Sequence, residues 1–142
     1  MENGRHAILM RIFKNKWFAK YAKSEGISDE KLVQAVKDIE DGNIDADYGG
    51  GVIKQRISRP GEGKSGGYRT IIIYRQKDAA FFLFGFAKSV MSNISRSDVK
   101  DFKKYAKILL SYTEEEVKAI LKTKELEEVK DEKNNSEEDK NI

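Results

Sequence analysis

The sequence predicts a small α+β domain with an antiparallel β-sheet and helices packed on one face of the sheet. Three observations support this fold class. The chain has 142 residues, enough for one domain with a hydrophobic core. Segments rich in β-branched and aromatic residues follow one another between residues 52 and 88. Segments with helical spacing of apolar residues precede and follow them, which gives the order β-α-α-β-β-β-α-α.

The N-terminal part of the chain predicts a short strand followed by a helical hairpin. Arg11–Phe13 forms the strand. Lys14–Lys23 has its aromatic and apolar residues spaced for one helix face, and Gly26 ends this helix. Ser28 is a suitable N-cap for a second helix, Asp29–Asp41, which carries an apolar stripe.

Val52–Arg59 predicts the first strand of the central sheet. The alternation of side chains along a strand places Lys54 and Arg56 on one face, with their side chains about 7 Å apart. Two cations this close repel each other unless an anion lies between them. The strand therefore indicates a place where a negatively charged group is stabilised.

A glycine-rich loop and two further strands follow. The loop, residues 60–67, holds four glycines and Lys64, but it lacks the spacing of a P-loop and precedes a strand, which argues against nucleoside triphosphate binding. Tyr68–Arg75 and Ala79–Phe86 are the strands, and the second is continuously apolar, as expected of a strand buried on both faces. Gly85 within it indicates a bulge or a close backbone approach.

The C-terminal part predicts two helices and a charged tail. Residues 95–98 form a capping box that begins a helix through about Ser111, and residues 113–116 cap another. We therefore place the folded domain at residues 1–126. Residues 127–142 are charged and weakly hydrophobic, which predicts disorder.

Charge is unevenly distributed along the chain. Residues 127–142 hold seven acids and three lysines, which is a net charge of −4. Because the whole chain carries +3, residues 1–126 carry a net charge of +7. A basic folded part suits a polyanionic partner such as nucleic acid, although a soluble domain with spare lysines has the same composition. No apolar run approaches the roughly 20 residues of a membrane span. The absence of cysteine is compatible with a reducing, cytoplasmic setting.

The residue types between positions 49 and 89 limit the possible chemistry. This stretch has no histidine and no obvious carboxylate pair, so zinc sites, Ser-His-Asp triads and two-metal chemistry lack their parts, and we expect no cofactor. Lysines and arginines can still cleave RNA, because a lysine can accept the proton of a ribose 2′-OH while arginines bind the scissile phosphate. A phosphate-binding patch without catalysis would have the same sequence.

Several motifs in the chain match a known pattern. They are Lys54-Gln-Arg56, Gly63–Thr70 (GKSGGYRT), Phe84–Ser89 (FGFAKS) and Asn93-Ile94. They resemble those of RelE/HigB-like toxins of bacterial type II toxin–antitoxin systems, particularly the HigB-2-type subfamily, and the resemblance covers roughly residues 13–110. It implies a ribosome-dependent mRNA endonuclease that needs no metal. It also implies a cognate antitoxin, often with a helix-turn-helix, besides ribosome and mRNA as partners.

The resemblance implies roles for four cations. Lys54 and Arg56 match a pair of basic residues, of which one is the candidate general base and the other a phosphate contact. Arg69 matches an arginine that stabilises the transition state, and Lys88 falls within a basic pair that closes the last strand. Ser89 stands where the second cation of that pair is expected, so the general acid stays unassigned.

Lys64, Tyr68 and Arg75 are candidate RNA contacts. Two of them have plainer alternatives, Lys64 as a solvated charge and Tyr68 as a core or rim residue. Arg69, one of the four cations above, has the alternative of pairing with an acid on a neighbouring element. For the whole protein, the alternatives are a ParE-like toxin that inhibits DNA gyrase without cleaving RNA, or an antitoxin-binding module without nuclease activity.

Overall fold

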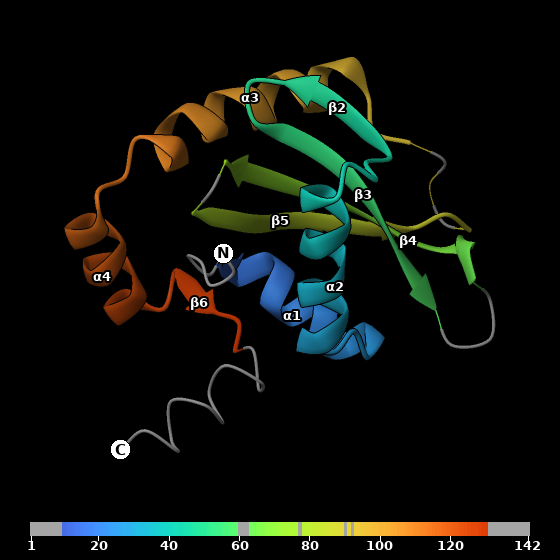
Figure 1. Cartoon of the computed structure of the whole chain (residues 1–142), viewed down its shortest axis with the longest axis horizontal. Coiled ribbons are helices and arrows are strands. Elements are labelled where there is room, and N and C mark those ends of the chain that lie inside the picture. The colour runs from blue at the N-terminus through green and yellow to red at the C-terminus, as the bar shows by residue number, and fades with distance from the viewer. Residues whose placement is uncertain (1–9, 60–62, 77, 90, 92, 131–142) are drawn as a thin grey trace, which may run out of the picture.

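The computed structural model describes residues 10–59, 63–76, 78–89, 91 and 93–130. Figure 1 shows a curved sheet with helices packed around it. The elements are β1 (Arg11–Asn15), α1 (Lys16–Glu25), α2 (Asp29–Glu40), β2 (Ala46–Gly49), β3 (Val52–Arg59), β4 (Gly63–Arg75), β5 (Ala79–Ala87), α3 (Arg96–Leu110), α4 (Glu114–Thr123) and β6 (Leu126–Glu128).

The sheet is mixed, and the expectation of a purely antiparallel sheet was wrong. Its six strands lie in the order β2-β3-β4-β5-β1-β6, and β1 pairs with β5 in parallel while the other pairs are antiparallel. Only a short hairpin forces two strands to be antiparallel. Between β1 and the rest of the sheet the chain instead passes through two helices. The parallel pairing stacks Phe13 on Phe81, with ring centroids 5.1 Å apart.

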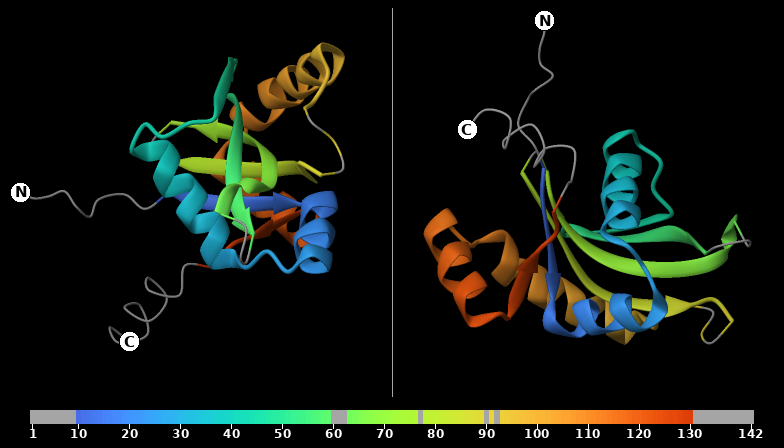
Figure 2. Two further views of the ribbon diagram at one scale, coloured as in Figure 1. Left: turned by 90° about the vertical axis from the view of Figure 1, so that its right-hand side faces the viewer. Right: turned by 90° about the horizontal axis from the view of Figure 1, so that it is seen from below.

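Helices cover both faces of the sheet, which corrects the prediction of one covered face. Figure 2 shows α2 and α3 on opposite sides of it. Ile72 on β4 and Phe82 on β5 belong to the core beneath α1 and α2, whereas Ile73 and Phe81 belong to the core beneath α3 and α4. Since β4 and β5 carry apolar residues on both faces, burial of both faces requires two helical layers.

Helices α2, α3 and α4 begin at the residues that their caps predict, whereas α1 begins at Lys16, after its N-cap Asn15, and not at Lys14. Ser28 accepts a hydrogen bond from the backbone of α2, and capping boxes begin α3 at Ser95 and α4 at Thr113. Helix α1 ends at Gly26, which has the left-handed φ of 72°. However, α1 packs on β5 and β1 while α2 packs on β3, so the expected helical hairpin is not confirmed.

Strand β5 contains a bulge two residues before Gly85. The register with β4 shifts between Ile71 and Ile72, which leaves Leu83 as an extra residue on β5. Both Leu83 and its successor Phe84 therefore belong to the core beneath α3 and α4. At Gly85 an added Cβ would lie 2.7 Å from the Tyr21 ring. The close approach predicted at this glycine is thus made by an aromatic ring rather than by backbone.

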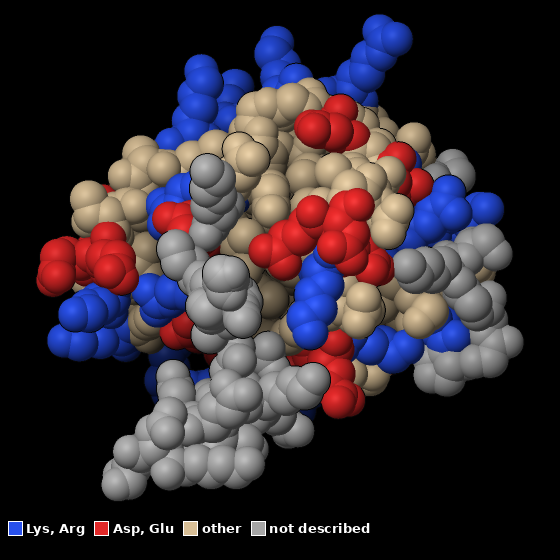
Figure 3. All heavy atoms as spheres, in the orientation of Figure 1, with Lys and Arg blue, Asp and Glu red and all other residues tan. Residues whose placement is uncertain are grey.

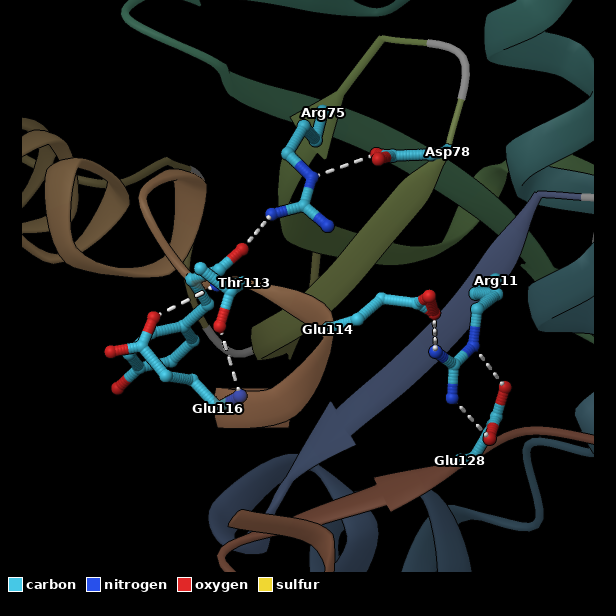
Figure 4. A network of polar contacts seen from close by, with 8 residues as sticks. Arg11, Arg75, Asp78, Thr113, Glu114, Glu116 and Glu128 are labelled. Carbon is cyan, nitrogen blue, oxygen red and sulfur yellow. Dashed lines mark hydrogen bonds and ion pairs between the residues drawn. The ribbon is translucent and has the colours of Figure 1, made fainter. Parts of the chain in front are cut away.

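The structure differs from the prediction at two boundaries, namely the start of the strand after the glycine-rich loop and the end of the folded domain. Strand β4 begins at Gly63, inside the predicted loop, because Gly67 has no Cβ to strike the carbonyl oxygen of Ile57 on β3. The domain boundary placed after residue 126 falls inside β6. Arg11 donates to both carboxylate oxygens of Glu128 at 2.9 and 3.0 Å (Figure 4), so charge in this segment pairs with β1 instead of remaining solvated. Residues 131–142 of the predicted tail lie outside the described residues.

Candidate functional site

Three of the predicted site residues meet on one face of two neighbouring strands. Lys54 and Arg56 come from β3 and Arg69 from β4, and we call these three residues the basic cluster. Arg56 is the direct cross-strand partner of Arg69, and Lys54 is the partner of Ile71. Ile71 belongs to the core beneath α3, so the basic cluster lies on the α3 side of the sheet.

A carboxylate lies among the three cations. Asp45, just before β2, has Oδ1 at 2.8 Å from Nε of Arg56. Its Oδ2 lies 3.7 Å from Nζ of Lys54 and 3.8 Å from Nε of Arg69. The expected alternative for Arg69, a pairing with an acid from a neighbouring element, is therefore present. Sequence reasoning did not identify Asp45, because only the path of the chain after α2 brings it over the sheet.

A buried glutamine holds this acidic residue in place. Gln55 lies between Lys54 and Arg56 in sequence but is 3% exposed and points to the opposite face of β3. Its Oε1 accepts a hydrogen bond from the backbone N–H of Asp45 at 3.0 Å, and its Nε2 donates to the carbonyl of Asn43 at 2.7 Å. The connection between α2 and β2 is thereby fixed to the same strand that supplies two of the cations.

The three cations differ strongly in exposure. The side chain of Arg69 is 7% exposed, that of Lys54 14% and that of Arg56 45%. An open groove of about 490 Å³ lies beside Asp45 and Arg56. Arg56 is thus the cation that an incoming anion reaches first, and Arg69 is covered.

Hydrogen bonding within the basic cluster is incomplete. Nη1 of Arg69 and Oδ2 of Asp45 are both buried and have no hydrogen-bond partner within the described part of the chain. Most buried polar atoms in proteins have a partner, because an unpaired one costs about 1–3 kcal/mol. Arg69 therefore retains donor capacity that a phosphate oxygen could use.

The segment after β5 also reaches the basic cluster. Nζ of Lys54 donates to Oδ1 of Asn93 at 3.1 Å, and the same oxygen accepts a hydrogen bond from the backbone of Ile94 at 2.9 Å. Lys88 is exposed, and its backbone N–H donates to the carbonyl of Gly67 at 3.4 Å, so it lies at the same end of the sheet. Among the described residues no contact joins the Lys88 side chain to the basic cluster.

A comparison with known families assigns the chain. The family model for the RelE toxin of the RelE/RelB toxin–antitoxin system matches residues 10–129, which is most of the 142 residues. The chain belongs to the RelE toxin family. It is therefore a toxin of a toxin–antitoxin system, with an antitoxin as partner. Neither a curated protein nor a solved structure matches it.

The RelE family match includes all the predicted site residues, but the fold does not bring all of them together. Tyr68 is 3% exposed in the core beneath α1 and α2, and its hydroxyl donates to the backbone carbonyl of Glu25 at 3.2 Å. It lies on the face opposite to the basic cluster. The side chain of Lys64 lies outside the described part of the structure.

Arg75 lies at the other end of β4 and has structural partners. Its Nε donates to Asp78 at 2.7 Å across the turn between β4 and β5. Its Nη1 donates to the carbonyl of Tyr112 at 2.8 Å, in the connection between α3 and α4 (Figure 4). In this RelE-family chain, Arg75 thus joins the sheet to a helical layer and is separate from the basic cluster.

Further positive charge lies outside the basic cluster. In Figure 3, Lys and Arg side chains project from the edge of the molecule at which Figure 1 draws α3. The exposed cations of α3 are Arg96, Lys100, Lys103, Lys104 and Lys107. No three His, Cys, Asp or Glu side chains of the described residues lie close enough to hold a metal ion, and no described helix is both long and apolar enough to cross a membrane.

Proposed function

We propose that this RelE-family toxin is a ribosome-dependent mRNA endonuclease of the HigB-2 type. It enters the ribosome and cleaves the mRNA by attack of a ribose 2′-OH on the adjacent phosphate. The bond between phosphorus and the 5′-oxygen breaks, leaving a 2′,3′-cyclic phosphate and a 5′-hydroxyl. The observation that carries this proposal is the convergence of Lys54, Arg56 and Arg69 from two neighbouring strands.

Each cation has a role suited to its chemistry. Lys54 accepts the proton of the 2′-OH, because a lysine can release its own proton whereas an arginine does not. Arg56 and Arg69 bind the phosphate oxygens, on which negative charge develops in the transition state. Lys88, at the same end of the sheet, is the candidate that returns a proton to the leaving 5′-oxygen. Lys64 contacts the RNA backbone.

Mapping of mRNA 5′ ends on translating ribosomes tests this function. Cells that express the chain should show new 5′ ends in phase with codons. These ends should disappear in the Arg69→Ala variant and persist in Lys118→Ala, which removes an exposed charge of α4. If mRNA stays intact while growth stops, the proposal is wrong.

One observation favours a second candidate function. Arg69 is covered and paired with Asp45, which is also what a structural arginine in a non-catalytic toxin would show. A ParE-like inhibitor of DNA gyrase, or a module that only binds its antitoxin, would follow from this reading. Stalled DNA replication with intact mRNA would support the gyrase inhibitor.

The cognate antitoxin is proposed to carry a helix-turn-helix and to act in the cytoplasm with the toxin. A short reading frame beside the toxin gene that encodes such a protein would identify it. Co-expression of that protein should restore growth and should yield a stable complex with the toxin. Failure to restore growth would exclude it as the antitoxin.

A further inference from the structure

The basic cluster holds an anion already in the free protein, and that anion is part of the chain. Asp45 lies within 3.8 Å of Arg69 and Lys54 and within 2.8 Å of Arg56. A carboxylate and a phosphate present similar acceptor oxygens to a guanidinium. An RNA phosphate that binds both Arg56 and Arg69 must therefore take the position that Asp45 now occupies.

The burial of Arg69 leads to the same conclusion. With 7% of its side chain exposed, Arg69 cannot contact a phosphate from solvent unless a neighbouring group moves. Of its charged neighbours in the described residues, Asp45 is the one within ion-pair distance. The fit of Asp45 is also imperfect, because its Oδ2 makes no hydrogen bond and Nη1 of Arg69 has no partner.

We propose that Asp45 is an internal anion that occupies the phosphate position of the basic cluster and leaves it when RNA binds. The proposal rests on the proposed function in one respect, namely that the ligand of the cluster is an RNA phosphate. Arg56, with 45% of its side chain exposed beside the open groove, makes the first contact. The phosphate then exchanges with the carboxylate at Arg69.

The side chain of Asp45 can rotate without unfolding the residues around it. The hydrogen bonds to Gln55 hold the backbone of residues 43–45, so rotation of the Asp45 side chain leaves them intact. The groove lined by Gly42, Asn43, Ile44 and Arg56 gives the displaced carboxylate access to water. The exchange keeps one negative group among the cations throughout, which limits their mutual repulsion.

Titration of the wild-type protein with inorganic phosphate, followed by NMR, tests the exchange directly. The signals of the Asp45 carboxyl carbon and of the Arg69 Nε–H group should change along one saturation curve. A response of Arg69 while Asp45 stays unchanged would overturn the proposal, and so would the absence of any response at Arg69. This measurement does not depend on whether the protein cleaves RNA.

The Asp45→Asn variant gives the second test. The amide keeps the size of the side chain and can still accept from Arg56, but it does not compete as an anion. The dissociation constant for inorganic phosphate should fall roughly fivefold, as expected from loss of one charge near the surface. Asp101→Asn, an exposed position on α3, is the matched control and should change it little. Equal or weaker phosphate binding by Asp45→Asn would show that Asp45 positions the cations instead.

Cleavage of mRNA is measured separately on both variants. Faster cleavage by Asp45→Asn at low ribosome concentration, together with tighter phosphate binding, supports the exchange and the nuclease. If Asp45→Asn binds phosphate more tightly but the wild type cleaves no mRNA, the result supports the exchange and contradicts the nuclease function. The two proposals therefore fail by different results.

Discussion

Arg56 and Arg69 lie directly opposite each other on β3 and β4, although both carry a positive charge. Like charges at opposed positions of a sheet destabilise it. Asp45 reduces this cost, but it bonds closely only to Arg56 and leaves a buried nitrogen of Arg69 without a partner. An arrangement that is poor for stability and favourable for anions is typical of a site kept for function.

Replacing Arg69 should therefore separate stability from activity. Arg69→Met keeps much of the side-chain volume and removes the incompletely bonded charge. Because Lys54 and Arg56 still neutralise Asp45 and the repulsion between Arg56 and Arg69 is removed, we expect the free energy of unfolding, measured in urea, to stay within about 1 kcal/mol of wild type or to rise. Cleavage of ribosome-bound mRNA should fall by about 10²-fold or more, because a donor to the developing charge is lost. A loss of about 3 kcal/mol in stability would instead mark Arg69 as a structural residue.

Arg75 should behave in the opposite way. Its Nη1 bond to the Tyr112 carbonyl links β4 to the connection between α3 and α4, and its side chain is 24% exposed. Arg75→Met should lower the unfolding free energy by about 1–3 kcal/mol, the range for losing a part-buried hydrogen bond from a charged donor. Asp78→Ala, which removes only the half-exposed ion pair, should cost less than about 1 kcal/mol. The rate of mRNA cleavage per folded molecule should not change in either variant. A loss of cleavage in Arg75→Met alone would show that Arg75 belongs to the functional site.

The sequence predicted those parts of the site that depend on local periodicity. Alternation along β3 placed Lys54 and Arg56 on one face, as the structure has them, but only the observed register shows that Arg69 on β4 shares that face. Tyr68 was proposed as an RNA contact, whereas the structure buries it on the face opposite to the basic cluster. Asp45 escaped prediction because its position depends on how a loop crosses the edge of the sheet, which no short-range pattern encodes.

The errors in the predicted fold also concern features that short-range sequence patterns do not encode or that were not inferred from them. The parallel pairing of β1 with β5 joins residues far apart in sequence, so no turn signalled it. The sequence contained the information for a second helical layer, although the prediction placed helices on one face only. A continuously apolar β5, buried on both faces, cannot exist with helices on one face only. The charged segment at Glu127–Glu128 folds because Arg11 and Lys14 on β1 neutralise it.

Gly85 should not tolerate a side chain while Tyr21 occupies its present position. A Cβ at Gly85 would lie 2.7 Å from Tyr21 and 3.2 Å from Phe18. Gly85→Ala should therefore lower the unfolding free energy by about 1–3 kcal/mol, the usual cost of overpacking. In a Tyr21→Ala background the same change should cost clearly less, because the nearest ring is gone. Equal costs in both backgrounds, measured by urea unfolding, would contradict the proposed contact.

The stability of the protein in alkali should depend on Tyr21. Burial, assisted by the nearby Glu25, raises the pKa of Tyr21 to about 12. The unfolded chain loses this proton near its ordinary pKa of about 10. Between these values the native state binds more protons, so stability falls as pH rises, whereas below about pH 10 Tyr21 contributes no pH dependence. The decline in unfolding free energy above about pH 10 should be shallower in Tyr21→Phe, and parallel curves for the two proteins would contradict the shift.

Salt dependence should reveal which cations bind phosphate. Each phosphate contact releases counterions from RNA, so the logarithm of the binding constant falls linearly with the logarithm of salt concentration. Arg56 is the most exposed member of the basic cluster, and its removal should reduce the magnitude of this slope by about one unit. We would measure binding of a short RNA to Arg56→Gln and to the control Lys118→Gln across a salt series. Because Lys118 lies on α4, away from the cluster, its loss should leave the slope close to that of wild type. Equal slopes for all three proteins would show that RNA binds elsewhere, and the exposed lysines of α3 would then be the next surface to substitute.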